Sequence, residues 1–221
     1  MCGRYTLEDI NELSKFYEVE LPTETKPNYN AAPTQTMPII KDGKEVELMK
    51  WGFRPFWMKD KPGGYSLFNT RSEDAFHKST WSKAMRERRC IILASAFYEW
   101  KAETDGKHPF YIHLKDQPYL SLAGIWGTFD IDGVKQNCFS ILTTSPNAEM
   151  ENIHNRMPVI LHKDDIATWL NPDTSEEQDL ERLLQPYDNG QLIMHEVSRD
   201  VNVVKNNNDQ LIVPVTNTLK S

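Results

Sequence analysis

Three Asp-Gly pairs limit the folds open to this chain more than any other feature of its sequence. They are Asp42-Gly43, Asp105-Gly106 and Asp132-Gly133, and each lies between two runs of strand-forming residues. Asp-Gly readily supplies the positive φ angles that tight hairpin turns require. Three such hairpins predict a mainly antiparallel sheet that curls or closes into a barrel-like core.

The strands predicted around these turns are short, and the predicted helices are fewer. The strand runs are 37–40 and 46–51, 90–100 and 109–114, and 119–129 and 138–144. The first predicted helix runs through Leu13 and Phe16 and has a capping-box-like start at Thr6 and Asp9. The others are a basic amphipathic helix over 80–89 and two acidic, exposed helices over 164–170 and 174–184. The pattern indicates the α+β class, with an antiparallel, barrel-like sheet core and peripheral helices.

The length and the cysteine count exclude several protein classes. A chain of 221 residues without repeats or an evident linker fits a single domain over 1–221. The cysteines are Cys2, Cys90 and Cys138, an odd number that argues against a secreted disulfide framework and favours a reducing cytosol. No apolar run approaches the roughly 20 residues of a membrane span, and no hydrophobic signal core follows the start. We therefore expect a cytoplasmic protein with no membrane partner.

The charge is unevenly distributed along the chain. The net charge of −7 argues against a nucleic-acid partner, but residues 41–115 carry 15 basic and 10 acidic groups. Affinity for nucleic acid depends on local phosphate contacts rather than on total charge. The basic middle region therefore fits either a mixed, solvated surface or a local nucleic-acid contact.

Cys2 stands at a position with its own chemistry. The initiator Met is normally removed when the second residue is small, so the mature chain would begin with Cys2. The α-amine and the thiol have reference pKa values of about 7.7–8.0 and 8.5, so both are usable nucleophiles near neutral pH. Together they can condense with an aldehyde to an imine that the thiol closes to a thiazolidine. Position alone also fits a cysteine without a role.

Two segments combine groups that suit contact with a nucleic-acid strand. Residues 51–57 place four aromatics around a glycine and an arginine, which fits base stacking or a buried aromatic cluster. Asn69 and Arg71 would lie on one side of an extended segment. There an amide and a guanidinium could hold a sugar hydroxyl and a phosphate, or simply form a polar surface strand.

Two other segments carry groups for proton transfer. Glu99 lies in the apolar run 97–100, where partial desolvation would suit a general acid, although pairing with a structural arginine fits as well. His154 lies near Arg156, and histidine is the usual proton shuttle near neutral pH, although a lone histidine is often structural. The cysteines and the other histidines lack metal-ligand spacing, and no glycine-rich phosphate loop is present. We expect no metal and no cofactor.

Taken in order, these motifs resemble the SOS-response-associated peptidase (SRAP) family. The motifs are Cys2-Gly3-Arg4, 30–33, 51–52, 69–73, 97–100 and 154–158, followed by 197–199 and Asn206. Each is short, but six in order over about residues 2–207 form a specific signal. The resemblance implies a mixed α/β domain with a barrel-like sheet core and a positively charged groove.

The resemblance also implies a function. It implies a protein that senses abasic sites in single-stranded DNA and crosslinks to them through Cys2 as a thiazolidine, which shields the lesion. The resemblance also implies autoproteolytic exposure of Cys2 and is compatible with lyase-type activity. It implies no obligate protein partner, and it places the protein on the nucleoid when DNA is bound. A thiol peptidase acting on other proteins and a non-covalent single-stranded DNA-binding module remain as alternatives.

Residue roles follow from the same resemblance. Cys2 would be the nucleophile, Asn69 would orient the opened sugar or the Cys2 backbone, Glu99 would act as acid and base, and His154 would be a second proton shuttle. The implied DNA contacts are Arg4, Asn30, Phe56, Trp57, Arg71, Lys78 and Arg156.

Overall fold

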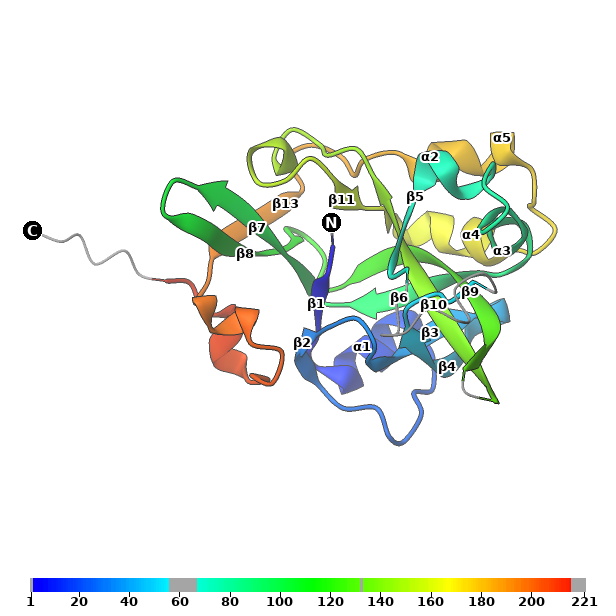
Figure 1. Ribbon diagram of the computed structural model, residues 1–221, viewed down its shortest axis with the longest axis horizontal. Helices are drawn as coiled ribbons and strands as arrows, with labels where there is room; N and C mark the ends of the chain where they lie inside the picture. Colours follow the sequence, from blue (N-terminus) through cyan, green and yellow to red (C-terminus); the bar gives the residue numbers. More distant parts are fainter. Residues whose placement is uncertain (1, 56–66, 132, 216–221) are drawn as a thin grey trace, which may run out of the picture.

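Two β-sheets form the framework of the molecule, and the computed structural model describes residues 2–55, 67–131 and 133–215 (Figure 1). The strands are β1 (Arg4–Leu7), β2 (Asn28–Ala31), β3 (Thr36–Lys41), β4 (Glu45–Trp51), β5 (Asn69–Arg71), β6 (Arg89–Ala94), β7 (Ala96–Glu103), β8 (Gly106–Leu114), β9 (Leu120–Ile131), β10 (Val134–Thr144), β11 (Met157–Pro158), β12 (Ile160–Leu161) and β13 (Leu192–Glu196). The α-helices are α1 (Ile10–Tyr17), α2 (Ser72–Ala75), α3 (Ser82–Glu87), α4 (Ile166–Leu170) and α5 (Glu177–Leu180). No helix in these ranges is long and apolar enough to cross a membrane.

The larger sheet closes into a ring. Strands β10, β4, β3, β6 and β9 are neighbours in that order, and β9 pairs with β10 again. Most pairs are antiparallel, but β10 runs parallel to β4 and to β5. Closure removes the free edges of a sheet. The predicted barrel-like core with peripheral helices is confirmed, and its sheet is mixed at β10.

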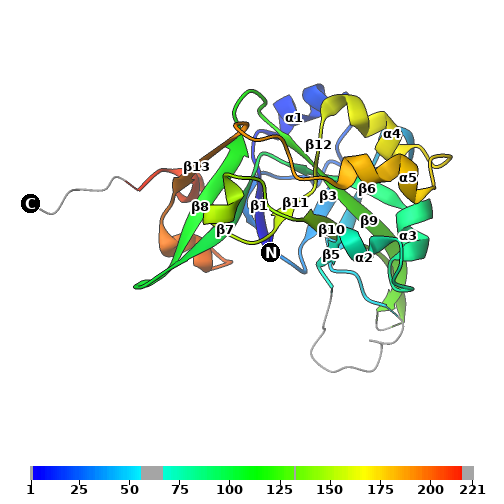
Figure 2. The ribbon, with the colours of Figure 1, turned by 90° about the horizontal axis from the view of Figure 1, so that it is seen from above.

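The smaller sheet lies beside this barrel and carries the start of the chain. Its order is β13-β8-β7-β1-β2, with every pair antiparallel. β1 lies between β7 and β2, and its Arg4 pairs with Tyr98 of β7. Figure 2 shows helices α2 to α5 gathered on the barrel side, away from the β7–β8 hairpin. The residues after Cys2 therefore run along an inner strand of the smaller sheet rather than along its edge.

All three predicted hairpins are present. The turn between β3 and β4 is a 3₁₀ segment, η1 (Asp42–Lys44), in which each residue has a positive φ. The β7–β8 hairpin closes at Gly106 with φ 132°, and the β9–β10 hairpin closes at Gly133 with φ 82°. Asp132 lies outside the described residues. Glycine tolerates these backbone angles without steric cost, so the sequence signal has a direct conformational cause.

Two predicted boundaries differ from the structure. The run 90–100 is two strands, β6 and β7, which belong to different sheets and separate at Ser95. The Ser95 amide donates to the carbonyl of Thr6 (2.8 Å), and its hydroxyl accepts from the amide of Glu8 (3.0 Å). The first helix begins at Asp9 rather than Thr6, because the Asp9 carboxylate accepts from the amides of Asn11 and Glu12.

The other predicted helices are shorter than expected, and the last two are not simply exposed. The basic helix is α3, followed at once by β6. The acidic segments become η4 (Lys163–Asp165) with α4, and α5 with η5 (Glu181–Leu184). Trp169 of α4 and Leu180 of α5 are fully buried. Both segments therefore bury an apolar residue and expose acidic ones, such as Asp164 and Asp179.

Arg89 fastens two of these helices to the barrel. Its guanidinium is buried and donates to the carbonyls of Met85 and Arg86 at the end of α3, and to those of Trp169 and Asn171 at the end of α4. Carbonyls at a helix C-terminus lack partners within the helix and attract cations. Burial lowers the pKa of Arg89 to about 10, which leaves it charged at neutral pH.

We expect Arg89→Met to lower the free energy of unfolding by about 3 kcal/mol, since it strands several buried carbonyls. Urea denaturation of both proteins measures this difference. Arg86→Met is the matched control, because within the described residues the Arg86 guanidinium makes two long hydrogen bonds, at 3.3 and 3.4 Å, and lies over the ring of Phe76. Equal losses for the two variants would contradict the capping role.

Candidate active site around Cys2

Cys2 is buried where β1 begins and is held by the barrel. Its exposed fraction is 0%, and its carbonyl accepts a hydrogen bond from Nδ2 of Asn69 (2.9 Å). Asn69 opens β5, which is aligned by its parallel pairing with β10. The Oδ1 atom of Asn69 is buried and has no donor among the described residues. The amide thus fixes the Cys2 backbone while leaving one acceptor for another group.

Glu99 and His154 face one open cavity of about 400 Å³. Glu99 lies on β7, the strand that pairs with β1, and is 2% exposed. His154 follows a 3₁₀ turn, η3 (Met150–Asn152), and its amide donates to the carbonyl of Met150 (2.8 Å). Cys2 lies close enough to Glu99 to feel its charge. The thiol of Cys2, which precedes β1, therefore lies near the Glu99 carboxyl of β7, and this carboxyl shares a cavity with the His154 imidazole before β11.

The environment of Cys2 disfavours its thiolate. Burial raises the pKa of the Cys2 thiol far above its usual value, and the negative charge of Glu99 raises this pKa further. The thiol is therefore protonated at neutral pH in this state. Chemistry at this residue has to begin at another group or pass the thiol proton to a base.

Arg4 and Asn30 hold the C-terminal segment against β1 and β2. The Arg4 guanidinium donates to Oδ1 of Asn30 (2.7 Å) and to the carbonyl of Val201 (2.6 Å), and it lies 5.9 Å from the ring centre of Trp100. Asn30 is buried, and its Nδ2 donates to the carbonyls of Val201, Val203 and Asn206. Asn30 does not line the cavity of Glu99 and His154. Both residues thus organise the cavity wall.

The remaining predicted DNA contacts lie in different surroundings. Arg71 is exposed at the end of β5, and its guanidinium has no carboxylate partner within the described ranges. Lys78 pairs with Asp74 (2.7 Å). Arg156 is 14% exposed and bonds both carboxylate oxygens of Glu73. Arg71 is thus available to a phosphate, whereas Lys78 and Arg156 already have anionic partners.

The aromatic segment 51–57 is only partly described. Trp51 and Phe53 are buried, and Trp51 stacks on Phe139 with ring centres 6.0 Å apart. For these two residues the buried-cluster interpretation is correct. Phe56 and Trp57, the predicted base-stacking pair, lie outside the described residues.

Three cavity residues escaped the sequence analysis as individual candidates. They are Trp100, Lys107 and Asn202, of which Asn202 accepts a hydrogen bond from Nε1 of Trp100 (2.7 Å). Trp100 lies inside a motif that pointed to its neighbour Glu99. Lys107 follows the predicted Asp-Gly turn, which places it beside the strand of Glu99. Asn202 lies 102 residues further along the chain than Trp100, and no local pattern indicates that approach.

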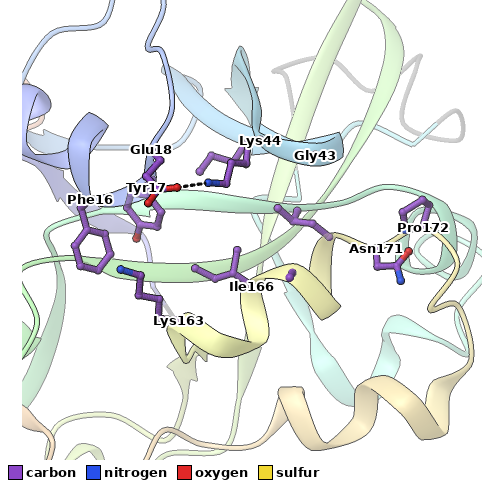
Figure 3. A pocket seen from close by; sticks show the side chains of 12 residues that line it. Phe16, Tyr17, Glu18, Gly43, Lys44, Lys163, Ile166, Asn171 and Pro172 are labelled. Carbon is purple, nitrogen blue, oxygen red and sulfur yellow. Dashed lines mark hydrogen bonds and ion pairs between the residues drawn. The ribbon is translucent and has the colours of Figure 1, made fainter.

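A separate pocket of about 540 Å³ lies between α1, η1 and α4 (Figure 3). Phe16, Ile166 and Leu170 contribute to its apolar surface, and Lys44 pairs with Glu18 at its rim (2.8 Å). It shares no lining residue with the cavity of Glu99 and His154. Cys2 does not line this pocket.

Comparison with known proteins identifies relatives that match nearly the whole chain. The chain is 39% identical to the abasic site processing protein YoqW of Bacillus subtilis, with 96% of this chain and 99% of that protein covered. It is 30% identical to the abasic site processing protein YedK of Escherichia coli, with 97% and 100% covered. A solved structure of a protein from Bacteroides thetaiotaomicron has the same fold, with a TM-score of 0.85 at 23% identity and coverage of 97% and 100%.

The family comparison covers nearly the whole described molecule. The family model described as SOS response associated peptidase matches residues 1–204, a range that includes Cys2, Asn69, Glu99, His154 and the 3₁₀ segment η6 (Arg199–Asn202) that walls the cavity. With this match and the fold in agreement, the chain belongs to the SOS response associated peptidase (SRAP) family.

Proposed function

We propose that this protein processes abasic sites in DNA, and that it does so by crosslinking Cys2 to the lesion in a single strand. The names of the relatives support the first part. The placement of Cys2 supports the crosslinking part of the proposal. Asn69 donates a hydrogen bond to the Cys2 carbonyl, and the thiol lies close enough to Glu99 for an electrostatic interaction. The cytoplasm, with attachment to the nucleoid on DNA binding, is the proposed place of action.

The reaction we propose needs an aldehyde and the two nucleophiles of an N-terminal cysteine. An abasic deoxyribose opens to a C1′ aldehyde, which the α-amine of Cys2 attacks after removal of Met1. Loss of one water gives an imine. The thiol sulfur then bonds to C1′ while its proton passes to the nitrogen, which closes a thiazolidine with no further leaving group.

Each neighbouring group has a task in this sequence. Glu99 gives a proton to the ring oxygen as the sugar opens and regains one from the C1′ hydroxyl. It then gives a proton to the hydroxyl that leaves as water, regains one from the nitrogen as the imine forms, and relays the thiol proton to that nitrogen as the sulfur attacks. His154 shuttles protons for ring closure and reversal from the other side of the cavity. Asn69 positions Cys2 and offers its unused Oδ1 to a sugar hydroxyl.

Ring closure also determines what happens to the DNA strand. An imine at C1′ promotes β-elimination of the 3′ phosphate, which is lyase chemistry. A thiazolidine carries no C=N bond and stops this reaction, so the strand stays intact. Lyase-type cleavage should therefore increase when closure is slow.

Autoproteolytic exposure of Cys2 is part of the proposal for chains that begin with further residues. The Cys2 thiol would attack the preceding carbonyl, transfer the acyl group from nitrogen to sulfur and free the amine, and water would then hydrolyse the thioester. The protonated, buried thiol requires a base for this step, and Glu99 is the charged neighbour.

A denaturing gel tests the proposal. Protein lacking Met1, as checked by intact mass, is mixed with a single-stranded oligonucleotide from which uracil has been excised. A shifted band with damaged but not undamaged DNA supports a covalent lesion sensor. Turnover of a peptide in trans would instead indicate a thiol peptidase, and reversible binding without lesion preference would indicate a non-covalent module.

Arg71→Ala is expected to weaken DNA binding across sequences and to reduce the slope of log K against log salt by about 1. The reason is that Arg71 is exposed, uncommitted to a carboxylate and two residues from Asn69. Fluorescence anisotropy at several salt concentrations measures the slope. Lys78→Ala is the control, since its ammonium is paired with Asp74. An unchanged slope for Arg71→Ala would remove it from the phosphate contacts.

A further inference from the structure

Glu73 connects two segments of the site that are far apart in sequence. It is the second residue of α2, which directly follows the strand of Asn69. Its carboxylate accepts from both terminal nitrogens of Arg156, with Nη2 to Oε2 at 2.9 Å. Arg156 lies two residues after His154. The pair thus joins the segment that holds Cys2 to the segment that carries the imidazole.

Strand pairing brings these two segments to the same point of the barrel. At Thr143, β10 pairs with Arg71 of β5 and with Pro158 of β11. The Arg156 guanidinium also donates to the carbonyl of Thr143 (2.5 Å). A planar guanidinium bonded to a carboxylate through two nitrogens and to a backbone carbonyl has a single orientation. Hydrogen bonding from Arg156 lowers the pKa of Glu73, so the pair stays charged at neutral pH.

The backbone of Arg156 in turn orients His154. The Arg156 amide donates to Nδ1 of His154 (3.0 Å). Because an accepting nitrogen carries no proton, a neutral imidazole held this way has its proton on Nε2. Nδ1 also lies 3.2 Å from the Arg156 carbonyl oxygen, the longer contact that the other tautomer would use. The position of the Arg156 backbone therefore selects which nitrogen holds the proton.

We propose that Glu73 is a positioning residue for His154, acting through Arg156 to fix the imidazole as the Nε2–H tautomer. Arg156 then serves the proton shuttle rather than a DNA phosphate. The identity of the proton-transfer step rests on the proposed function, whereas the tautomer and its dependence on Glu73 do not. Glu73 itself is 57% exposed and touches neither Cys2 nor the cavity residues.

The first test is spectroscopic and needs no DNA. Long-range ¹H–¹⁵N NMR of the imidazoles, assigned with His154→Ala, reports which nitrogen is protonated. We expect the Nε2–H form for His154 at a pH where the ring is neutral, and a shift toward mixed tautomers in Glu73→Gln. Glu87→Gln is the matched control, because its carboxylate lies at 4.0 Å from Lys83 on α3. The Nδ1–H form in wild type, or an unchanged His154 signal in Glu73→Gln, would overturn the proposal.

The second test is a double-mutant cycle on the rate of adduct formation at saturating protein. We expect Glu73→Gln to slow the His154-dependent step about 10-fold. This is smaller than the roughly 10²-fold rate enhancement that a positioned acid–base group supplies, because the imidazole itself is still present. It should leave the Kd for undamaged DNA within about twofold and have no further effect in a His154→Ala background.

The outcomes of the cycle separate the possible failures. Equal slowing by Glu73→Gln in the wild-type and His154→Ala backgrounds would overturn the positioning role. Tighter DNA binding by Glu73→Gln with a steeper salt dependence would also overturn it, because Glu73 would then compete with DNA phosphate for Arg156. If wild type forms no adduct, the proposed function fails, and the NMR result still decides the positioning role.

Discussion

Cys2→Ala protein is expected to form no denaturation-resistant adduct with an abasic single strand, a loss that should reach the detection limit. The α-amine of the variant can still form an imine, but no thiol is present to close it. An imine hydrolyses in water, whereas a five-membered ring of C1′, nitrogen and sulfur persists. The measurement is the fraction of oligonucleotide shifted on a denaturing gel after fixed times.

Cys2→Ser is the matched control for this experiment. Its hydroxyl has nearly the size of the thiol but closes the imine poorly, so a band should appear only after hydride reduction. Both variants should keep the fold, because each keeps the Cys2 backbone carbonyl that accepts from Asn69 and changes the buried side chain little in size. A Cys2→Ala band as strong as that of wild type would exclude Cys2 as the nucleophile.

Glu99→Gln is expected to slow adduct formation by about 100-fold, within the range that a positioned acid–base group contributes. Glutamine keeps the shape of the side chain but has no acidic proton for the sugar oxygen and no carboxylate to accept the thiol proton. Glu99 is 2% exposed and faces the cavity, so water cannot easily replace it. Single-turnover gels with excess protein give the rate.

Glu103→Gln provides the control on the same strand. Glu103 lies four residues along β7, is exposed and pairs with Lys101 (2.7 Å). It should leave the rate unchanged, and neither variant should change the Kd for undamaged DNA by more than about twofold. Loss of DNA binding in Glu99→Gln, with a normal rate once DNA is bound, would make Glu99 a structural residue.

The parts of the fold that follow from local chemistry could be predicted from the sequence. An Asp-Gly turn between two strand-forming runs determines its hairpin whatever the rest of the chain does. The separation of β6 from β7 could not be predicted, because both are apolar and the break at Ser95 depends on Thr6 and Glu8 from β1 and its end. The pairings of β3 with β6 and of β10 with β4, which complete the barrel, join segments far apart in the chain and have no local signal either.

The site shows the same division. The motifs around Cys2, Asn69, Glu99 and His154 mark residues that the structure brings together. Arg4 and Asn30 have the side chains of DNA ligands, yet both bond the carbonyl of Val201, which lies 197 residues after Arg4 and 171 after Asn30. Glu73 was visible within its motif, but its partner Arg156 lies 83 residues further along the chain. Composition and spacing show which side chains are present. Contacts between segments far apart in the sequence determine whether such a side chain binds a ligand or holds the structure.

The most direct test of the central claim is intact-mass analysis of the adduct, with and without an alkylating reagent. The account predicts protein lacking Met1 plus oligonucleotide minus one water, with the Cys2 sulfur protected from alkylation after denaturation and Cys90 and Cys138 both alkylated. An adduct that retains Met1, or one in which the Cys2 thiol is still alkylated, would contradict the thiazolidine.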